Sequence, residues 1–456
     1  MRAEEEILPP CATCLDGRPR GFPLSFSPLP PALKPLFAIL FTAIAAIFHA
    51  SPSAAAEARL EELISRALES SQELAVASER VVIARQRAIR QGALDDPMLM
   101  LGIDNGVLRD PLAFDRDPAT AKVIGVSQML PFYGKRDLRR RGGEFEAEAE
   151  QERLLDKRLD IRRQVSETWL RIGLVDGSLR TVDETIDALG DLLRISETMY
   201  GVGRGEQQDV LGAQLERTRM EEMRLTLGGD RQRLVATLNG LVYLPADTPL
   251  AAVTLPDIGP SPSGVEELLS LALSRRPLFK AQAALLEKSL VGRELAEREF
   301  YPDLTLSVEY MQKEGSGMTG DDMYGLSLSM NLPVQQGRRQ AMVAEAGADY
   351  RMLLAEFDSM RNDLRRQLGE SLAGLARSRA LVALYRGGMV EQAAARHETL
   401  VASYRVGRAG FAAVLDGRMA LYDIERRLQQ ALAEYNIELA ALEALAGGAV
   451  DGGEKR

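Results

Sequence analysis

The chain contains Tyr200-Gly-Val-Gly-Arg204, and nearly the same five residues return as Tyr404-Arg-Val-Gly-Arg408. Other matching pairs lie at the same offset of about 205 positions: Leu68 and Leu273, Pro97 and Pro302, Gly134-Lys-Arg136 and Gly337-Arg-Arg339, and Val210-Leu211 and Val414-Leu415. A register kept over this distance indicates a duplicated unit. The glycine in each copy suits a tight helix reversal, because glycine adopts backbone conformations that other residues avoid.

Composition limits the classes of protein that the chain can represent. The 456 residues carry a net charge of −10, and long tracts rich in Ala, Leu, Glu, Arg and Gln contain few glycines or prolines. These tracts favour long helices, and the acidic balance argues against nucleic acid as a partner. With two histidines, no phosphate-binding loop and no nucleophile elbow, we expect no enzyme and no cofactor.

Residues 1–56 have the layout of an export signal. Lys34 precedes an apolar run over residues 36–48, and small residues at 53–56 form a cleavage region. That run of about 13 residues is too short to cross a bilayer as a helix. Both cysteines, Cys11 and Cys14, lie before it, so we expect no disulfide and no thiolate metal site after residue 56. A metal or redox Cys-x-x-Cys site at these two residues is the alternative.

Two short segments in each copy alternate between apolar and polar residues and are expected as β-strands. Their bounds are about 98–105 and 122–130 in the first copy, and about 304–312 and 323–332 in the second. Period-two alternation puts one face in an apolar environment and the other in water. Segments of about nine residues fit tilted transmembrane strands, although two ordinary hairpins packed on helices are the alternative.

Four strands from one chain cannot close a membrane barrel. About eight is the smallest number for such a barrel, and an open edge in lipid leaves unpaired backbone groups. If the strands lie in a membrane, several chains must therefore share them. Aromatic residues at both ends of the strands predict two interfacial girdles: Phe132, Tyr133, Phe300, Tyr301, Tyr310 and Tyr324.

Long helices are predicted for residues 135–200 and 338–404, each about 100 Å in length at 1.5 Å per residue. Shorter helical segments cover residues 60–89, 206–241, 264–300 and 411–446. We expect 206–241 to stack on 264–300, and 411–446 to stack on 60–89, which gives four matched columns below four strands. The repeats then span residues 57–241 and 264–447, with a proline-rich linker at 242–263 and a polar tail at 448–456.

The chain resembles the TolC-like outer-membrane efflux proteins of Gram-negative bacteria over about residues 58–447. The resemblance rests on the duplication, the proline-bounded strand pairs followed by Gly134-Lys-Arg136 and Gly337-Arg-Arg339, and the Tyr-x-Val-Gly turns. It implies a mainly α fold with a transmembrane β part. In that family three protomers form a 12-stranded β-barrel in outer-membrane lipid, continuous with a 12-helix periplasmic tunnel.

The resemblance also implies partners and a function. A homotrimer would dock onto a periplasmic membrane-fusion adaptor and an inner-membrane pump, of the RND type. The protein would be the passive exit duct of a tripartite efflux pump, located in the cell outer membrane with a periplasmic extension. A periplasmic coiled-coil adaptor or scaffold without a membrane barrel is the alternative. The cysteine of lipid-anchored relatives is absent after the signal, so we expect no acyl anchor.

Site residues follow from the resemblance at the two helix reversals. The residues expected to dock the adaptor are Val202, Gly203, Arg204, Val406, Gly407 and Arg408. In relatives, aspartates six and nine residues after the second tip glycine narrow the periplasmic aperture. Asp416 matches the latter, Ala413 replaces the former, and Asp209 lies six residues after Gly203. A threefold ring of Asp416, with Asp209, would favour cations at the entrance.

Several motifs resemble family members that are paired with heavy-metal pumps of the Cus and Czc type. They are Arg116-Asp-Pro-Ala-Thr120, Gly125-Val-Ser-Gln128, Leu130-Pro-Phe132, Gly134-Lys-Arg136 and Gln207-Gln-Asp-Val210. Thioethers near the strands could contact Cu(I) or Ag(I): Met98, Met100, Met129, Met311, Met318 and Met323. Packing is the simpler interpretation of these methionines, so we expect no metal site. We expect His397 to lie on an ordinary helix surface and Trp169 to pack between helices.

Overall fold

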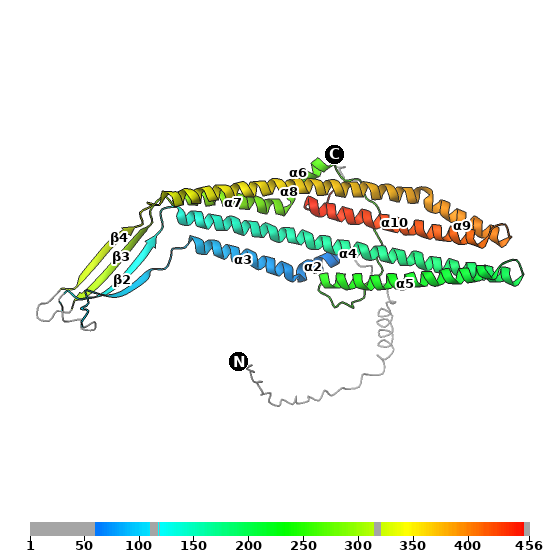
Figure 1. The fold of residues 1–456 in the computed structure, drawn as a ribbon, viewed down its shortest axis with the longest axis horizontal. Helices are drawn as coiled ribbons and strands as arrows, with labels where there is room; N and C mark the ends of the chain where they lie inside the picture. Colours follow the sequence, from blue (N-terminus) through cyan, green and yellow to red (C-terminus); the bar gives the residue numbers. More distant parts are fainter. Residues whose placement is uncertain (1–59, 110–116, 118, 314–320, 451–456) are drawn as a thin grey trace, which may run out of the picture. The chain divides into compact units, whose positions relative to one another are not determined.

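The computed structural model describes residues 60–109, 117, 119–313 and 321–450. The predicted signal segment, with Cys11 and Cys14, lies outside these residues, as does Met318. The described residues belong to one compact unit, in which helices run side by side and a single sheet follows their ends (Figure 1). None of the described helices combines the length and apolar character that a membrane crossing requires.

The two repeats have the same order of elements. The first contains α2 (Leu60–Ser70), α3 (Gln72–Gly92), β1 (Met98–Asp104), β2 (Ala121–Leu130), α4 (Lys135–Gly201) and α5 (Gln207–Leu241). The second contains α6 (Val265–Arg275), α7 (Pro277–Arg298), β3 (Leu304–Lys313), β4 (Met323–Met330), α8 (Gln336–Leu384), the π-helical segment η2 (Tyr385–Met389), α9 (Val390–Arg405) and α10 (Phe411–Ala446).

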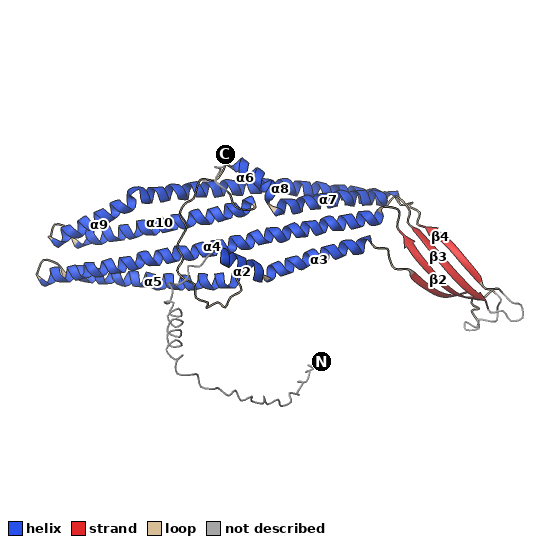
Figure 2. Ribbon diagram, turned by 180° about the vertical axis from the view of Figure 1, so that it is seen from behind, coloured by secondary structure: helices blue, strands red, loops and turns tan. Residues whose placement is uncertain are grey.

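The helices form four columns that continue into the four strands. The order across the molecule is α3 with α5, then α4, then α7 with α10, then α8 with α9 (Figures 1 and 2). The strands follow the same order, β1-β2-β3-β4, and every neighbouring pair is antiparallel. Each strand therefore extends one column, so the chain makes a wall that is helical over most of its height and β at one end.

The short helices stack within their own repeat, and the stacking expected from the sequence is wrong. The backbone N–H of Gln72, at the start of α3, donates to the hydroxyl of Tyr243, just after α5, at 3.0 Å. In the second repeat Gly447, after α10, lies against Arg276, before α7. Sequential helices joined by turns pack on the same long neighbour. Accordingly α3 and α5 both pack on α4, and α7 and α10 both lie between α4 and α8.

Each ascending segment is also broken where the sequence predicts one helix. Ser71 is extended and its hydroxyl accepts the N–H of Leu74 at 3.3 Å, so it caps the start of α3. Pro277 occupies the first position of α7 and biases Arg276 toward an extended conformation. The two breaks occupy equivalent positions, so both repeats change helix at the same point.

The second long helix differs from the first. Residues 135–200 are helical without interruption in α4, whereas residues 338–404 are divided by η2. Gly388 in η2 has φ 156° and ψ −27°, values that fall outside any helix. The pair Gly387-Gly388 makes this possible, and α9 bends away from the line of α8 (Figure 1).

The sheet is amphipathic across all four strands because the register aligns the alternation of each strand with its neighbours. One face carries Leu99, Leu101, Ile124, Val126, Leu306, Val308, Leu326 and Leu328. The other carries Gly125, Ser127, Thr305, Ser307, Glu309, Ser327 and Ser329. The apolar face is uncovered in the single chain, with Leu326 69% exposed. A patch of this kind indicates a contact with lipid or with another apolar surface.

Small residues allow the columns to approach closely. An added Cβ at Gly143, in α4, would lie 2.6 Å from Cα of Ala88 in α3, so these two backbones touch. The adjacent Gly142 faces away, and the nearest atom to its added Cβ is Cγ1 of Val291 at 3.8 Å. The sequence Gly142-Gly143 therefore contains one glycine that the packing requires and one that it does not.

Alanine substitutions at these two positions should have opposite effects. We expect Gly143→Ala to lower the free energy of unfolding by about 1–3 kcal/mol, since α3 must move away from α4. Gly142→Ala is the matched control and should raise the same quantity by about 0.5–1 kcal/mol, because alanine favours the helix. Denaturant unfolding of the detergent-solubilised protein measures both. Equal effects of the two variants would contradict this packing.

Candidate functional site

Both helix reversals are the same glycine-dependent turn. Gly203 and Gly407 have φ 71°, and no atom lies within 4 Å of an added Cβ at either position. The residue after each glycine donates its backbone N–H five residues back: Arg204 to Met199 at 2.9 Å, and Arg408 to Ser403 at 2.8 Å. These are Schellman motifs, which close a helix through a left-handed glycine. The requirement for glycine thus comes from the backbone and leaves the surface of each turn free.

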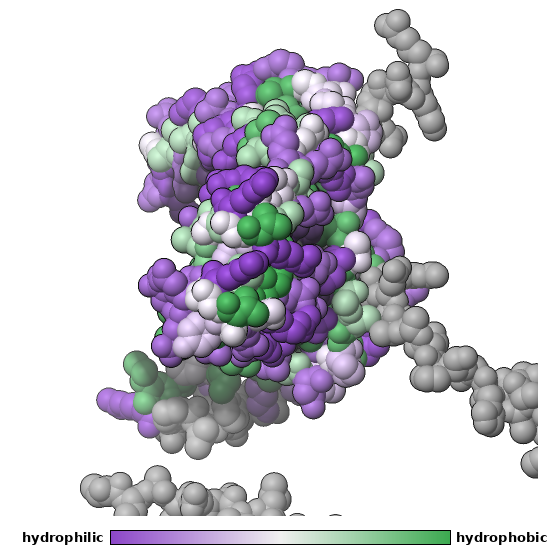
Figure 3. Space-filling model, turned by 90° about the vertical axis from the view of Figure 1, so that its right-hand side faces the viewer, coloured by the Kyte–Doolittle hydropathy of each residue, from purple (hydrophilic) through white to green (hydrophobic). Residues whose placement is uncertain are grey.

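All six residues expected to dock an adaptor are exposed at these turns. Val202 is 64% exposed and Val406 is 66% exposed, and an arginine follows each of them two residues later. Figure 3 views the molecule from the end where the helices turn, and apolar patches there lie among hydrophilic side chains. Each tip therefore offers an apolar residue next to a positive charge, a combination suited to protein contact.

The two tips are linked to each other by Tyr404. Its hydroxyl donates toward Oδ2 of Asp209 at 3.3 Å and lies 3.4 Å from Oγ of Ser196. Its ring packs edge-on against Phe411, with the ring centroids 6.1 Å apart. Burial raises the pKa of the Tyr404 phenol, and the charge of Asp209 adds to this effect. Tyr404 therefore stays protonated at neutral pH and remains a hydrogen-bond donor.

The structure does not bring the two predicted aperture residues into one cluster. Asp209 is half-buried and faces Tyr404, whereas Asp416 is exposed on α10. Within the described part of the chain no hydrogen bond or ion pair involves the side chain of Asp416. Of the two carboxylates, Asp416 is thus the one available to face an aqueous entrance. The link between Asp209 and Tyr404 could not be predicted from the sequence, because the two residues lie in different repeats.

The charged side chain of Arg418 is buried between α10 and α4. Arg418 is 7% exposed and donates through Nη2 to Oγ1 of Thr185 at 2.7 Å, which ties α10 to α4. Burial raises the pKa of nearby Glu425, and the charge of Arg418 opposes this shift. Burial also lowers the pKa of His397, and Arg418 lowers it further. His397 is half-buried on α9, rather than fully exposed.

The other singled-out residues have packing roles. Trp169 is buried in an apolar cluster with Val165 and Leu170, as expected. The described residues contain no group of three or more His, Cys, Asp or Glu side chains that could hold a metal ion. Met100 and Met311 lie on the polar face of the sheet and extend over Gly125 and Gly325 respectively.

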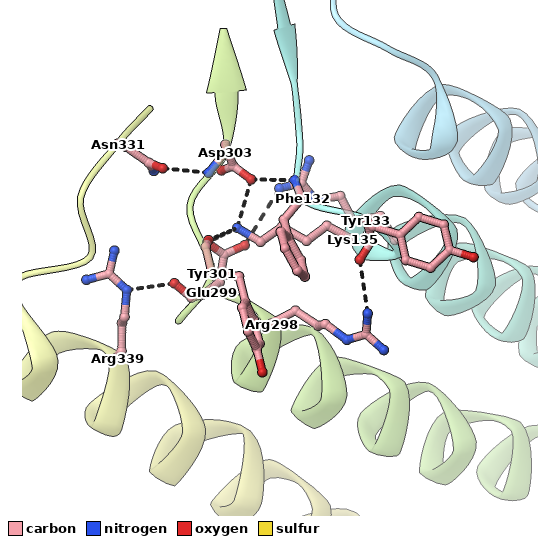
Figure 4. A network of polar contacts seen from close by, with 10 residues as sticks. Phe132, Tyr133, Lys135, Arg298, Glu299, Tyr301, Asp303, Asn331 and Arg339 are labelled. Atoms are coloured by element: carbon pink, nitrogen blue, oxygen red, sulfur yellow. Dashed lines mark hydrogen bonds and ion pairs between the residues drawn. The ribbon is translucent and has the colours of Figure 1, made fainter. Parts of the chain in front are cut away.

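The junction between sheet and helices holds a fully buried lysine. Lys135, at the start of α4, is 0% exposed, and its Nζ lies 2.9 Å from Oδ1 of Asp303 and 3.2 Å from Oε2 of Glu299 (Figure 4). Nζ also donates to the carbonyl of Tyr301 at 3.2 Å. Asp303 in turn accepts the backbone N–H of Phe132 at 2.8 Å. We call Lys135, Glu299 and Asp303 the junction clasp, which joins the first repeat to the second.

Gly134 is required for this arrangement. It has φ 87° at the start of α4, and an added Cβ would lie 2.7 Å from Nη1 of Arg298. That arginine donates to the carbonyl of Tyr133 at 3.0 Å (Figure 4). Phe132 stacks on Tyr301 with the ring centroids 4.5 Å apart. The aromatic residues predicted at this end of the strands therefore pack partly against each other.

The motifs Gly134-Lys-Arg136 and Gly337-Arg-Arg339 share the role of their last arginine but differ at the middle residue. Arg136 donates through Nε to the carbonyl of Gly92, and Arg339 donates in the same way to the carbonyl of Glu299, at 3.0 and 2.6 Å. Each arginine thus satisfies a carbonyl at the end of the preceding ascending helix. Arg338, the counterpart of Lys135, is exposed. The sequence flagged Lys135 as part of a motif, but its partners lie more than 160 positions away.

Duplicated helix columns that carry a sheet with one exposed apolar face are the features of an outer-membrane channel subunit. The chain belongs to the family described as outer membrane efflux protein, whose profile matches residues 63–242 and 268–448. It is 26% identical over 427 residues to the pyoverdine export outer membrane protein OpmQ of Pseudomonas putida (strain KT2440), covering 86% of this chain and 87% of OpmQ.

Solved structures share the fold. The outer membrane protein VceC from Vibrio cholerae is 20% identical with a TM-score of 0.72, covering 86% of this chain and 97% of VceC. CusC is 15% identical with a TM-score of 0.73, covering 87% of this chain and 93% of CusC. MtrE from Neisseria gonorrhoeae is 17% identical with a TM-score of 0.66, covering 87% of this chain and 91% of MtrE.

The family assignment confirms the resemblance to TolC-like proteins. It places the protein in the cell outer membrane, with a helical extension into the periplasm, as a channel of efflux. Members of this family are efflux channels rather than enzymes. The alternative of a periplasmic adaptor without membrane strands does not fit a four-stranded sheet with an exposed apolar face.

Removal of the buried lysine should weaken the junction. We expect Lys135→Met to lower the free energy of unfolding by about 3 kcal/mol, because Asp303 and Glu299 lose their charge partner in a largely buried place. Arg338→Met, at the equivalent but exposed position, should change it by less than about 0.5 kcal/mol. Thermal or denaturant unfolding of both variants tests the junction clasp, and equal stabilities would contradict it.

Loss of the Tyr404 hydroxyl should loosen the two tips without affecting the sheet. Tyr404→Phe keeps the ring and removes a donor to Asp209, so we expect a local loss of about 1 kcal/mol. Hydrogen exchange should then quicken in residues around 200–210 and 400–412 and stay unchanged in the strands. Tyr200→Phe is the control, since that tyrosine is half exposed. Similar exchange in the two variants would argue against the link.

Proposed function

We propose that three copies of the chain form one continuous passage and that the assembly is the exit duct of a tripartite efflux pump. The observation that supports this most directly is the sheet, in which β1 and β4 each pair on one side only within the described residues. In lipid, unpaired backbone groups cost several kcal/mol each, so these edges need partners. Three sheets of four strands give twelve, an even number in the range of membrane barrels.

The helical columns support the same arrangement. The two outer columns carry exposed apolar side chains, on α3, α5 and α8: Val76, Ile83, Ile89, Leu211, Leu215, Leu225, Met352 and Leu384. Neighbouring protomers would cover these residues if outer columns meet in the same order as outer strands. Three chains then supply twelve columns below twelve strands, which is the tunnel expected from the family resemblance.

The tips are proposed as the contact with a periplasmic membrane-fusion adaptor, and through it with an inner-membrane pump of the RND type. Val202, Arg204, Val406 and Arg408 are exposed at turns whose backbone is fixed by glycine. Asp416, exposed on α10, is proposed to line the periplasmic entrance and to favour cations there. Asp209 is assigned the different task of holding Tyr404.

The cargo is assigned to the pump rather than to this chain. A passive duct passes what its pump delivers, and the name of the relative OpmQ refers to pyoverdine rather than to a metal. Heavy-metal cations as cargo therefore stay a prediction from the motifs. Growth of a deletion strain with added metals or siderophores would distinguish these two cargo classes.

The purified protein should run as a heat-sensitive trimer and form pores in planar bilayers. Asp416→Ala should raise the single-channel conductance, because a ring of charged side chains at the narrow entrance is removed. Asp187→Ala, at an exposed position of α4, is the control and should leave the conductance unchanged. A monomer without pores would contradict the duct, and unchanged conductance of Asp416→Ala would remove that residue from the entrance.

A further inference from the structure

The sheet carries one carboxylate, that of Glu309, to which the proposed function assigns no role. Apart from tyrosines, the described strands contain four ionisable residues: Asp104, Lys122, Glu309 and Lys313. Asp104 and Lys313 are the last residues of β1 and β3, and Lys122 is the second residue of β2. Glu309 alone lies in the interior of a strand. Charged residues at membrane depth are costly and mark functional positions.

The register gives Glu309 an unusual setting. Glu309 pairs directly with Gly125 on β2 and with Gly325 on β4, so its two neighbours on the same face lack side chains. An added Cβ at Gly125 would lie 2.8 Å from Cγ of Glu309, and one at Gly325 would lie 3.9 Å from its Oε2. The side chain of Glu309 therefore extends into the space that these two glycines leave open, together with the ends of Met100 and Met311.

Among the described residues, no positive charge contacts Glu309 on its own face. Within the described residues no hydrogen bond or ion pair involves this side chain. At the end of the sheet farthest from the helices, Ala121 pairs with Asp104 on one side and with Lys313 on the other. Opposite charges therefore occur together there. Lys313 is four residues from Glu309, about 13 Å along the strand. Lys122 belongs to the opposite face by the alternation of β2.

On the two central strands, β2 and β3, the face that carries Glu309 is the more sheltered one. Ala121, Val123 and Gly125 on this face are buried, whereas Ile124 and Val126 on the other face are about half exposed. A membrane barrel directs its apolar face to lipid and its polar face to the lumen. In the proposed trimer, Glu309 from each protomer would therefore face the water-filled interior of the barrel.

We propose that Glu309 is a determinant of cation selectivity inside the barrel, separate from the periplasmic entrance. This inference rests on the proposed function, since it needs three copies around one pore. Twelve strands about 4.8 Å apart enclose a pore on the order of 20 Å wide. The Debye length is about 10 Å at 0.1 M salt and about 30 Å at 0.01 M, so the three charges act across the whole pore when salt is low.

Ion selectivity of single pores tests this assignment. We expect the wild type to prefer K⁺ over Cl⁻ in a KCl gradient near 10 mM, and Glu309→Gln to lose part of this preference. Glu309→Asp, which keeps the charge, should retain it. All three should converge in 1 M KCl, where the Debye length is about 3 Å. Asp416→Asn in the same assay separates the contribution of the entrance from that of the barrel.

A cysteine version keeps the test independent of folding defects. Cys11 and Cys14 are the only natural cysteines and are changed to serine in this background. In Glu309→Cys pores, a negatively charged methanethiosulfonate should restore cation preference, and a positively charged one should shift selectivity toward Cl⁻. Leu326→Cys, on the apolar face, should not react with either water-soluble reagent.

The outcomes separate this inference from the proposed function. Pores in which Glu309→Gln keeps wild-type selectivity at low salt, or in which the thiol of Glu309→Cys does not react, would overturn the assignment to Glu309 and leave the duct intact. Failure of the wild-type protein to form any pore would overturn both proposals. A graded response to the charge at position 309 would support the assignment.

Discussion

Lys135 holds the two repeats together at the base of the sheet, and the alignment of strands with columns depends on it. Its ammonium group bridges Glu299 and Asp303, which end the second ascending segment, while Lys135 itself begins the first long helix. A charge this deeply buried is stable only when its partners are fixed. Gly134 fixes the entry of the chain, and Phe132 and Tyr301 stack on each other at the same junction.

Local patterns predicted the elements well, whereas contacts between distant segments could not be predicted. Alternation over residues 304–312 gave β3, and the proline-free stretch after Gly134 gave α4. The break at Pro277 follows from proline chemistry but was hidden by continuous helical periodicity. Two features depend on contacts between distant segments: the link from Tyr404 to Asp209 and the stacking of the short helices. The periodicity of the sequence gives no information on such contacts.

The two repeats share the residues that stabilise the main chain, but they differ in the residues whose side chains have special roles. Arg136 and Arg339 still satisfy equivalent helix ends, and Gly203 and Gly407 still close equivalent turns. At these positions the geometry of the main chain determines the residue, and both repeats have the same main-chain geometry. Specialised positions have diverged, because only one copy needs a buried ammonium group or a carboxylate set between glycines. Sequence similarity between repeats is therefore best at locating structural residues, and differences between them are best at locating function.

Because strand order and column order coincide, a strand pair and its two columns behave as one building block. Blocks can be joined edge to edge without any new connection inside them. The circumference of a closed assembly is then counted in whole blocks, two from each polypeptide. Channels of different width could arise by changing how many blocks meet, while the internal design of each block is kept.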